Sequence, residues 1–127
     1  MATVELTKDN FEKVITESPI VIVDFWAPWC GPCRGFAPIY EQAAETHADV
    51  VFGKINSDQE QELAGAFGIR SIPTLMVFRE KVVLFQEAGA LPASALEKVI
   101  SQAKALDMAK VHQEIAEREK QEERPPV

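Results

Sequence analysis

The segment Ile20–Trp26 restricts the fold of this chain more than any other part of it. It reads Ile-Val-Ile-Val-Asp-Phe-Trp, an almost unbroken apolar run that is rich in β-branched side chains. Such a run is typical of a strand buried on both faces of a sheet. A strand of this kind needs helices on both sides of its sheet, so the sequence predicts an α/β fold.

Helix and strand patterns alternate around this segment. Before it, residues 4–6 predict a short strand, and Thr7 is expected to cap a helix that runs to about Glu17. After it, we expect a helix over 34–47 with Pro38 inside, a strand over 50–56, a helix over 59–67, a hairpin of strands over 74–79 and 82–87, and helical structure from about Pro92 to Glu123. The predicted architecture is a central mixed five-stranded sheet flanked by four helices, with an extended C-terminal helix.

Three local features complete this prediction. The connection Glu80-Lys81 lacks the Gly or Asn expected in a tight hairpin turn. Ser94 with Glu97 matches a capping box, although Pro92 is an alternative first residue of that helix. Pro125-Pro126 are expected to end the C-terminal helix.

Length and charge limit the class of protein. The chain has 127 residues, 46% of them hydrophobic, which suits one globular domain. A formal net charge of −7, with no local cluster of Lys and Arg, argues against nucleic-acid binding. No segment approaches ~18 consecutive apolar residues, so no membrane span is expected. The first residues carry no basic segment followed by an apolar one, so we expect no secretory signal and a cytoplasmic location.

The chain has two cysteines, Cys30 and Cys33, separated by two residues. A bridge that closes so short a loop adds little to stability, so reactivity or metal binding must explain the pair. Tetrahedral zinc needs four ligands, there is no second cysteine pair, and His47 and His112 show no ligand spacing. We therefore expect no metal site, and we expect both histidines to face solvent.

The position of the pair indicates how it is activated. Cys30 follows the buried strand and precedes a helix, so its sulfur should lie at the helix N-terminus, where negative charge is stabilised. Cys33 lies three residues on, on the same face and close enough to form a disulfide. We expect Cys30 to be the exposed attacking thiolate and Cys33 the more buried resolving thiol. Pro32 is tolerated in a first helical turn and stiffens it.

These residues also carry a family resemblance. The segment Asp24-Phe25-Trp26-Ala27-Pro28-Trp29-Cys30-Gly31-Pro32-Cys33 resembles the thioredoxin active-site signature over its full length. Further matches follow in order at Pro38, Lys54, Gly68-Ile69-Arg70-Ser71-Ile72-Pro73-Thr74 and Gly89-Ala90-Leu91, and together they cover about residues 3–105. The chain is identified as similar to the thioredoxin family.

The resemblance implies roles for residues beneath and beside the cysteines. Asp24 would act as general base for Cys33 through water, with Lys54 nearby; burial in an apolar strand should also raise its pKa. Pro73, after Ile72, would be a cis proline beside the sulfurs, in a loop that offers backbone groups to an extended substrate.

Further residues of the site follow from the same resemblance. Trp29 would form an exposed rim next to the nucleophile, in an active-site loop with Gly31 and Pro32. Gly89 and Ala90 would complete the substrate groove. Trp26 is expected to pack against the active-site loop, and Ser57 departs from the apolar rim residue of the best-known thioredoxins.

The implied activity is reduction of disulfides in partner proteins by dithiol–disulfide exchange. The family is re-reduced by an NADPH-dependent flavoprotein, thioredoxin reductase, so no bound cofactor is expected. Gly-Pro between the cysteines resembles the reducing members of the family.

Residues 107–127 depart most from the family. We divide the chain into a thioredoxin domain over 1–106 and a charged, helical extension over 107–127. Met108, Val111 and Ile115 have helical spacing and are able to form an apolar stripe. The extension is either a frayed continuation of a helix or a docking helix, and the alternative function is a binding or chaperone module that acts through it. We expect a monomer, with this helix as the contact of any weak dimer.

Overall fold

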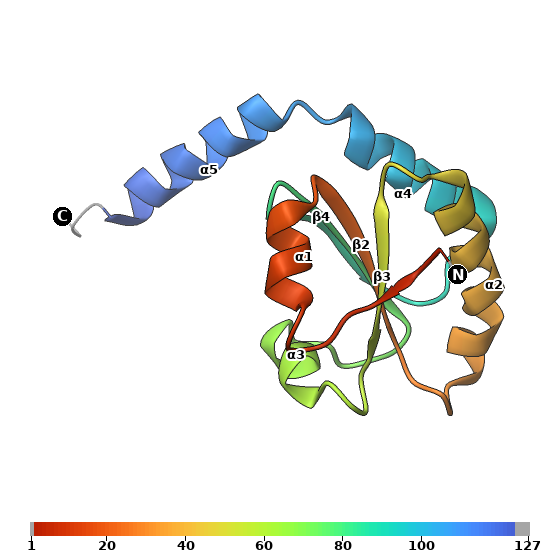
Figure 1. The fold of residues 1–127 in the computed structure, drawn as a ribbon. Coiled ribbons are helices and arrows are strands. Elements are labelled where there is room, and N and C mark those ends of the chain that lie inside the picture. The colour runs from red at the N-terminus through yellow and green to blue at the C-terminus, as the bar shows by residue number, and fades with distance from the viewer. Residues whose placement is uncertain (1, 124–127) are drawn as a thin grey trace.

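Five strands form one sheet in the order β1-β3-β2-β4-β5, which places the apolar segment at its centre (Figure 1). The strands are β1 (Val4–Glu5), β2 (Ile20–Trp26), β3 (Val51–Asn56), β4 (Thr74–Arg79) and β5 (Val82–Ala88). β1 and β2 run parallel to β3, whereas β4 is antiparallel to both β2 and β5. The computed structural model describes residues 2–123 and confirms the mixed five-stranded sheet.

The helices are α1 (Phe11–Glu17), α2 (Gly31–Thr46), α3 (Gln61–Ala66), α4 (Ala93–Ala105) and α5 (Met108–Glu123). α1 and α3 cover one face of the sheet, and α2 and α4 cover the other (Figure 1). Within residues 2–123, no helix combines the length and the hydropathy needed to cross a membrane. The four flanking helices and the C-terminal helix agree with the prediction.

Successive residues of β2 point into two different apolar cores. Ile22 packs with side chains of α2 and α4, whereas Val21 and Val23 pack with α1 and the α3 side. The buried phenol of Tyr40 on α2 lies 2.9 Å from the carbonyl oxygen of Ile22 and 2.7 Å from that of Gly53, so it ties α2 to both β2 and β3. Because both faces of β2 are covered, any polar residue inside this strand is buried.

Two predicted helix starts are wrong. Thr7 does not cap α1: it lies in a preceding turn, where the Asn10 carboxamide oxygen accepts its N–H at 2.7 Å, and Asn10 is the N-cap. Ser94 does not cap α4, because it already lies inside the helix. Pro92 occupies the N-cap position with an extended backbone and no side-chain capping bond, so it is not the first helical residue either.

The hairpin between β4 and β5 closes without glycine. Glu80 and Lys81 both have left-handed backbone conformations, with φ values of 52° and 69°. These conformations cost free energy in residues that have a Cβ atom. The connection whose geometry the sequence does not predict is thus a two-residue turn, formed by two residues that rarely adopt the left-handed conformation.

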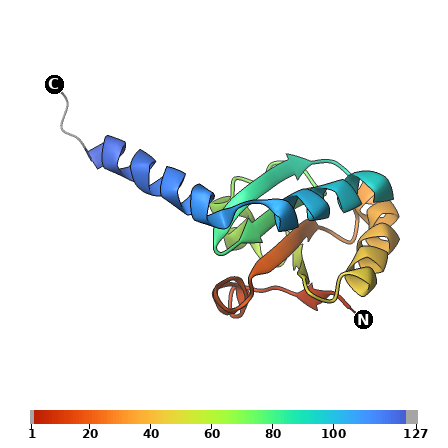
Figure 2. The same cartoon turned by 90° about the horizontal axis from the view of Figure 1, so that it is seen from above.

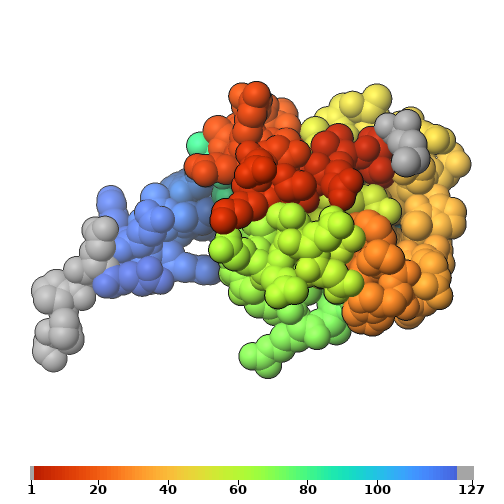
Figure 3. All heavy atoms as spheres, turned by 60° about the horizontal axis from the view of Figure 1, so that its bottom comes forward, coloured from red at the N-terminus to blue at the C-terminus, as the bar shows by residue number. Residues whose placement is uncertain are grey.

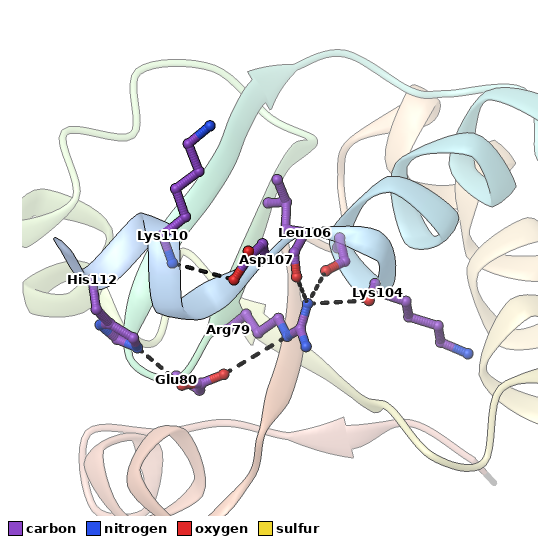
Figure 4. Close-up of polar contacts among 8 residues, drawn as sticks. Arg79, Glu80, Lys104, Leu106, Asp107, Lys110 and His112 are labelled. Atoms are coloured by element: carbon purple, nitrogen blue, oxygen red, sulfur yellow. Dashed lines mark hydrogen bonds and ion pairs between the residues drawn. The ribbon is translucent and has the colours of Figure 1, made fainter. Parts of the chain in front are cut away.

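The C-terminal helix is broken, which corrects the expected continuous helix from Pro92 to Glu123. α4 ends at Ala105, and Leu106 has an extended backbone. The guanidinium of Arg79 donates from Nη1 to the carbonyl oxygens of Ala103, Lys104 and Leu106, at 2.8, 3.1 and 2.9 Å (Figure 4). A charged donor that satisfies the last carbonyl groups of α4 stabilises its end at this point.

α5 contacts the domain around its first turn. Met108 is buried, the Asp107 carboxylate accepts the N–H of Lys110 at 3.2 Å, and His112 Nε2 lies 2.9 Å from Glu80 Oε1 (Figure 4). Beyond this turn α5 extends away from the sheet and its helices (Figure 2). The expected helix end at Pro125-Pro126 lies outside the described residues.

Replacing Arg79 by Met should weaken the joint between α4 and α5. The free energy of unfolding should fall by roughly 1–3 kcal/mol, because hydrogen bonds from a charged donor to three carbonyl groups are lost. Amide hydrogen exchange at Val111, in the first turn of α5, should also become faster. Urea unfolding and hydrogen exchange measure the two effects. The matched control is Arg118→Met on the exposed part of α5; equal behaviour of both variants would contradict this account.

Candidate active site

The two cysteines lie where β2 and β3 end on the same edge of the sheet. β2 ends at Trp26 and β3 at Asn56, which are paired neighbours in the parallel ladder. The loop after β2 leads directly into α2, and on the molecular surface its atoms adjoin the segment that follows β3 (Figure 3). The carboxyl ends of neighbouring parallel strands commonly form ligand sites, so this edge is the candidate site.

Cys30 and Cys33 are joined by a disulfide, with their Cα atoms 5.2 Å apart. Cys30 is the N-cap of α2, and its sulfur accepts the backbone N–H of Cys33 at 3.2 Å. The helix begins at Gly31, three residues before the expected start at Arg34, and Pro32 is its second residue. In the reduced protein, this N–H group and the helix dipole would stabilise a thiolate at Cys30.

The expected difference in exposure between the two cysteines is wrong for the disulfide form. Cys30 is 4% exposed and Cys33 is 3% exposed. Both sulfurs belong to a small cluster in which Ala27, Trp26 and Ile72 cover them. Accessibility therefore does not distinguish attacker from resolver, and the distinction rests on the position of Cys30 at the helix N-terminus.

Asp24 is buried beneath this edge of the sheet, at 1% exposure. Its Oδ1 atom makes no hydrogen bond within the described residues. Burial raises the pKa of Asp24 from its ordinary 3.8 to about 7, although the positive charge of Lys54 opposes this rise. A carboxyl group with a pKa near 7 is able to exchange protons at neutral pH.

Lys54 is the cross-strand neighbour of Asp24 in the β2–β3 ladder. Its ammonium lies 4.6 Å from the ring centroid of Trp26, as in a cation–π contact. Among the carboxylates of residues 2–122, none lies within 4.0 Å of this ammonium. Trp26 in turn packs against the cluster of Ala27, Cys30 and Cys33, which confirms its expected contact with the active-site loop.

The loop before β4 lies against the nucleophile. The Ile72–Pro73 peptide bond is cis, as the resemblance implies, and the carbonyl oxygen of Ile72 lies 3.7 Å from Cys30 Sγ. Gly89 has a φ of 110° and donates its N–H to the carbonyl oxygen of Pro73 at 2.8 Å. The exposed Ala90 follows it. Backbone contacts thus join Ile72 to Cys30 and Gly89 to Pro73, while Ala90 is linked to this loop only as the neighbour of Gly89.

Asp58 belongs to the site although it is not among the residues predicted from the sequence. Trp29 is 66% exposed, and its indole N–H donates to Asp58 Oδ2 at 2.9 Å. Asn56 shapes the intervening loop, because its Oδ1 accepts the N–H groups of Asp58 and Gln59 at 3.0 and 3.3 Å. The polar run Asn-Ser-Asp at the end of β3 was the available signal, since β2 and β3 end on the same edge.

Ser57 borders a hollow on the α3 side of Trp29. The hollow has a volume of about 360 Å³ and also reaches Asp58, Arg70 and Ile72. The hydroxyl of Ser57 is buried and has no hydrogen-bond partner within residues 2–123. The side chain at this point of the rim is therefore small, and its hydroxyl is turned away from solvent.

The histidines lie away from the site. His47 is half-buried, which corrects its expected exposure: Nε2 lies 2.8 Å from Glu97 Oε2, and Nδ1 lies 3.1 Å from the Lys104 ammonium. His112 is exposed, as predicted, and contacts Glu80. No three His, Cys, Asp or Glu side chains in the described part of the chain are grouped to hold a metal ion.

A disulfide at the start of a helix, beside a cis-proline loop and after a strand that buries a carboxyl group, is the arrangement of a thiol–disulfide oxidoreductase. The thioredoxin family model matches residues 2–102. This chain belongs to the thioredoxin family.

Individual relatives agree with this assignment. A Streptomyces coelicolor protein described as putative thioredoxin 2 is 54% identical over 120 residues, covering 94% of this chain and 90% of the relative. A thioredoxin of Alicyclobacillus acidocaldarius is 47% identical over 97 residues, covering 76% of this chain and 92% of its own. The solved structure of a mutant thioredoxin from Halobacterium salinarum matches with a TM-score of 0.77 at 31% identity, covering 83% of this chain and 93% of its own. The match with the Streptomyces protein extends beyond residue 102, where the family model ends.

Replacing Asp24 by Asn should make folding stability less dependent on pH. Between about pH 4 and pH 7 the folded protein keeps a proton on Asp24 that the unfolded chain loses, because the folded pKa is raised to about 7. The stability contributed by protonated Asp24 is therefore lost as the pH rises through this window, by a few kcal/mol at about 1.4 kcal/mol per pH unit.

Urea unfolding of the oxidised protein at several pH values measures this effect. The stability of Asp24→Asn relative to the original protein should rise from pH 4 to pH 7 and then stay constant. The exposed variant Glu12→Gln serves as control and should show no such rise. A constant difference between Asp24→Asn and the original protein would contradict the raised pKa.

Proposed function

We propose that this chain is a protein-disulfide reductase in which Cys30 is the nucleophile and Cys33 the resolving thiol. The observation that carries the proposal is the position of the Cys30 sulfur at the N-terminus of α2, where it accepts the N–H of Cys33. This position favours the thiolate at Cys30, and the thiolate is the form that attacks a disulfide.

The reaction begins with the reduced protein. The Cys30 thiolate attacks one sulfur of a substrate disulfide, a Cys30–substrate disulfide forms, and the other substrate sulfur leaves as a thiolate that takes up a proton. The backbone N–H of Cys33 stabilises the thiolate before the attack.

The second step releases the substrate. Asp24 accepts the proton of the Cys33 thiol by way of water, and the Cys33 thiolate attacks Cys30 Sγ. The substrate sulfur leaves as a thiolate and is protonated, and the two electrons of the dithiol have passed to the substrate. The pKa of about 7 at Asp24 supports this role, since the carboxylate is then able to take a proton near neutral pH. Lys54 would stabilise the carboxylate form.

An extended segment of the substrate would bind across the site. Ile72 and Pro73 offer backbone groups on one side of Cys30, and Gly89 and Ala90 would extend this surface. The exposed indole of Trp29 would cover the other side, held by Asp58. Gly31 and Pro32 form the helix start that fixes the two sulfurs.

The partners would be disulfide-containing proteins and a thioredoxin reductase. Because the oxidised Cys30–Cys33 pair must be reduced again, an NADPH-dependent flavoprotein would supply the electrons, and the chain itself would bind no cofactor. We place this activity in the cytoplasm, where thiols are kept reduced.

Serine variants of the cysteines test the assignment of roles. In an insulin-reduction assay, Cys30→Ser and Cys33→Ser should each lose steady-state turnover. Only Cys33→Ser should accumulate a stable mixed disulfide with substrate, because Cys30 still attacks and no resolving thiol remains. Mass spectrometry of the trapped complex measures this. A mixed disulfide on Cys33 in Cys30→Ser, and none in Cys33→Ser, would reverse the roles.

A second candidate function is a docking module that acts through α5. One observation favours it: α5 is mounted by Met108 and His112 and then extends away from the domain (Figures 1 and 2). Val111 and Ile115 remain only half-buried on it. The division of the chain at residue 106 coincides with the helix break and remains a prediction, as does the monomeric state.

Removing residues 113–127 separates this role from catalysis, because it leaves the joint at His112 intact. The shortened protein should reduce insulin at an unchanged rate if α5 serves docking alone. Sedimentation of both proteins, with Cys30→Ser as a full-length inactive control, measures self-association. A large loss of insulin reduction on truncation would contradict the separation of the two roles.

A further inference from the structure

One row of side chains crosses the whole sheet at the level of Asp24. The row consists of directly paired residues on the five adjacent strands, from β1 to β5: Glu5, Lys54, Asp24, Leu75 and Glu87. Directly paired residues of neighbouring strands point to the same face. A glutamate therefore lies two strands away from Asp24 on each side, Glu5 on β1 and Glu87 on β5. Between Asp24 and Glu5 the intervening residue is a lysine, whereas on the β5 side it is a leucine.

The lysine side of this row opens into a cavity. Glu5, Lys54 and Trp26 line it from the sheet, and Pro38 and Glu41 line it from α2; its volume is about 560 Å³. Glu5 is exposed, whereas Asp24 is buried and does not line the cavity. The Lys54 side chain thus lies between a buried carboxyl group and an exposed carboxylate.

The two carboxylates in the cavity differ in their availability. Glu41 is engaged, because its oxygens accept the N–H of Ala2 at 2.8 Å and the hydroxyl of Thr3 at 3.0 Å. Among the side chains of residues 2–122, the carboxylate of Glu5 makes neither a hydrogen bond nor an ion pair, and no carboxylate lies within 4.0 Å of the Lys54 ammonium. Lys54 has a long, flexible stem, so its charge is able to move along the row.

We propose that Glu5 is a positioning residue for proton transfer at Asp24: its carboxylate draws the Lys54 ammonium toward the cavity and away from the buried carboxyl group. The inference rests on the proposed role of Asp24 as general base. Because Lys54 favours the charged form of Asp24, moving its charge away favours the protonated form. Glu5 thereby makes Asp24 a stronger proton acceptor once it is ionised.

Other titratable groups around Asp24 do not replace Glu5 in this role. On α2, Tyr40 is buried, and burial followed by the charge of Asp24 raises its pKa well above 10, so it stays neutral. Cys33 on α2 is held in the disulfide in the oxidised protein, and Glu41 is engaged by Ala2 and Thr3. Glu87, on β5, is separated from Asp24 by Leu75 and has no lysine to act through.

The experiment is an NMR titration of the Asp24 carboxyl carbon in the oxidised full-length protein at 0.15 M salt. Over about 10 Å, twice the strand spacing, a direct charge effect through water is screened to roughly 0.1 pH unit. Glu5→Gln should lower the Asp24 midpoint by at least about 0.3 pH unit, because Lys54 returns to Asp24. Glu87→Gln is the matched control and should shift it by no more than the direct effect.

A double variant shows whether the effect passes through Lys54. In a Lys54→Met background, which keeps the aliphatic stem, Glu5→Gln should shift the Asp24 midpoint by no more than roughly 0.1 pH unit. Equal shifts from Glu5→Gln with and without Lys54, or from Glu5→Gln and Glu87→Gln, would overturn the proposal. So would no shift at all in Glu5→Gln.

Kinetics separate this inference from the proposed role of Asp24. The rate of release of substrate from the mixed disulfide, followed against pH, should have its midpoint lowered in Glu5→Gln by the same amount as the NMR titration. If Asp24→Asn left that rate unchanged, the role of Asp24 as base would fail, while the coupling of Glu5, Lys54 and Asp24 would still be decided by the titrations.

Discussion

The burial of β2 on both faces is the constraint on which the rest of the structure depends. It places Ile22 in one core and Val23 in the other, and it keeps Asp24, the next residue of the strand, out of contact with water. A carboxyl group in that position favours its protonated form. The loop after β2 leads directly to the start of α2. The fold that buries Asp24 therefore also places Cys30 at a helix N-terminus.

Features set by local sequence were predictable. The apolar run of β2 identified the central strand, and the spacing of Cys30 and Cys33 after it identified the reactive helix start. These features depend on residues within one or two turns of each other, where periodicity and helix geometry are informative. The raised pKa of Asp24 also followed from its apolar neighbours alone.

Features set by contacts between distant segments were not predictable. The break at Leu106 depends on Arg79 from β4, and the half-burial of His47 depends on Glu97 and Lys104 from α4. Trp29 is held by Asp58, which comes from the loop after another strand. Asp107 supplies a local cap for the start of α5, but the carbonyl groups at the end of α4 are satisfied by a tertiary partner, Arg79.

The reduction potential of the Cys30–Cys33 couple decides whether this pair donates electrons to its partners or accepts electrons from them. Equilibration of the full-length protein with a glutathione buffer, read out by the fraction of disulfide, measures it. We expect a potential more negative than that of the cytosolic glutathione pool, below about −240 mV. A potential near about −120 mV, typical of a strong oxidant, would contradict it.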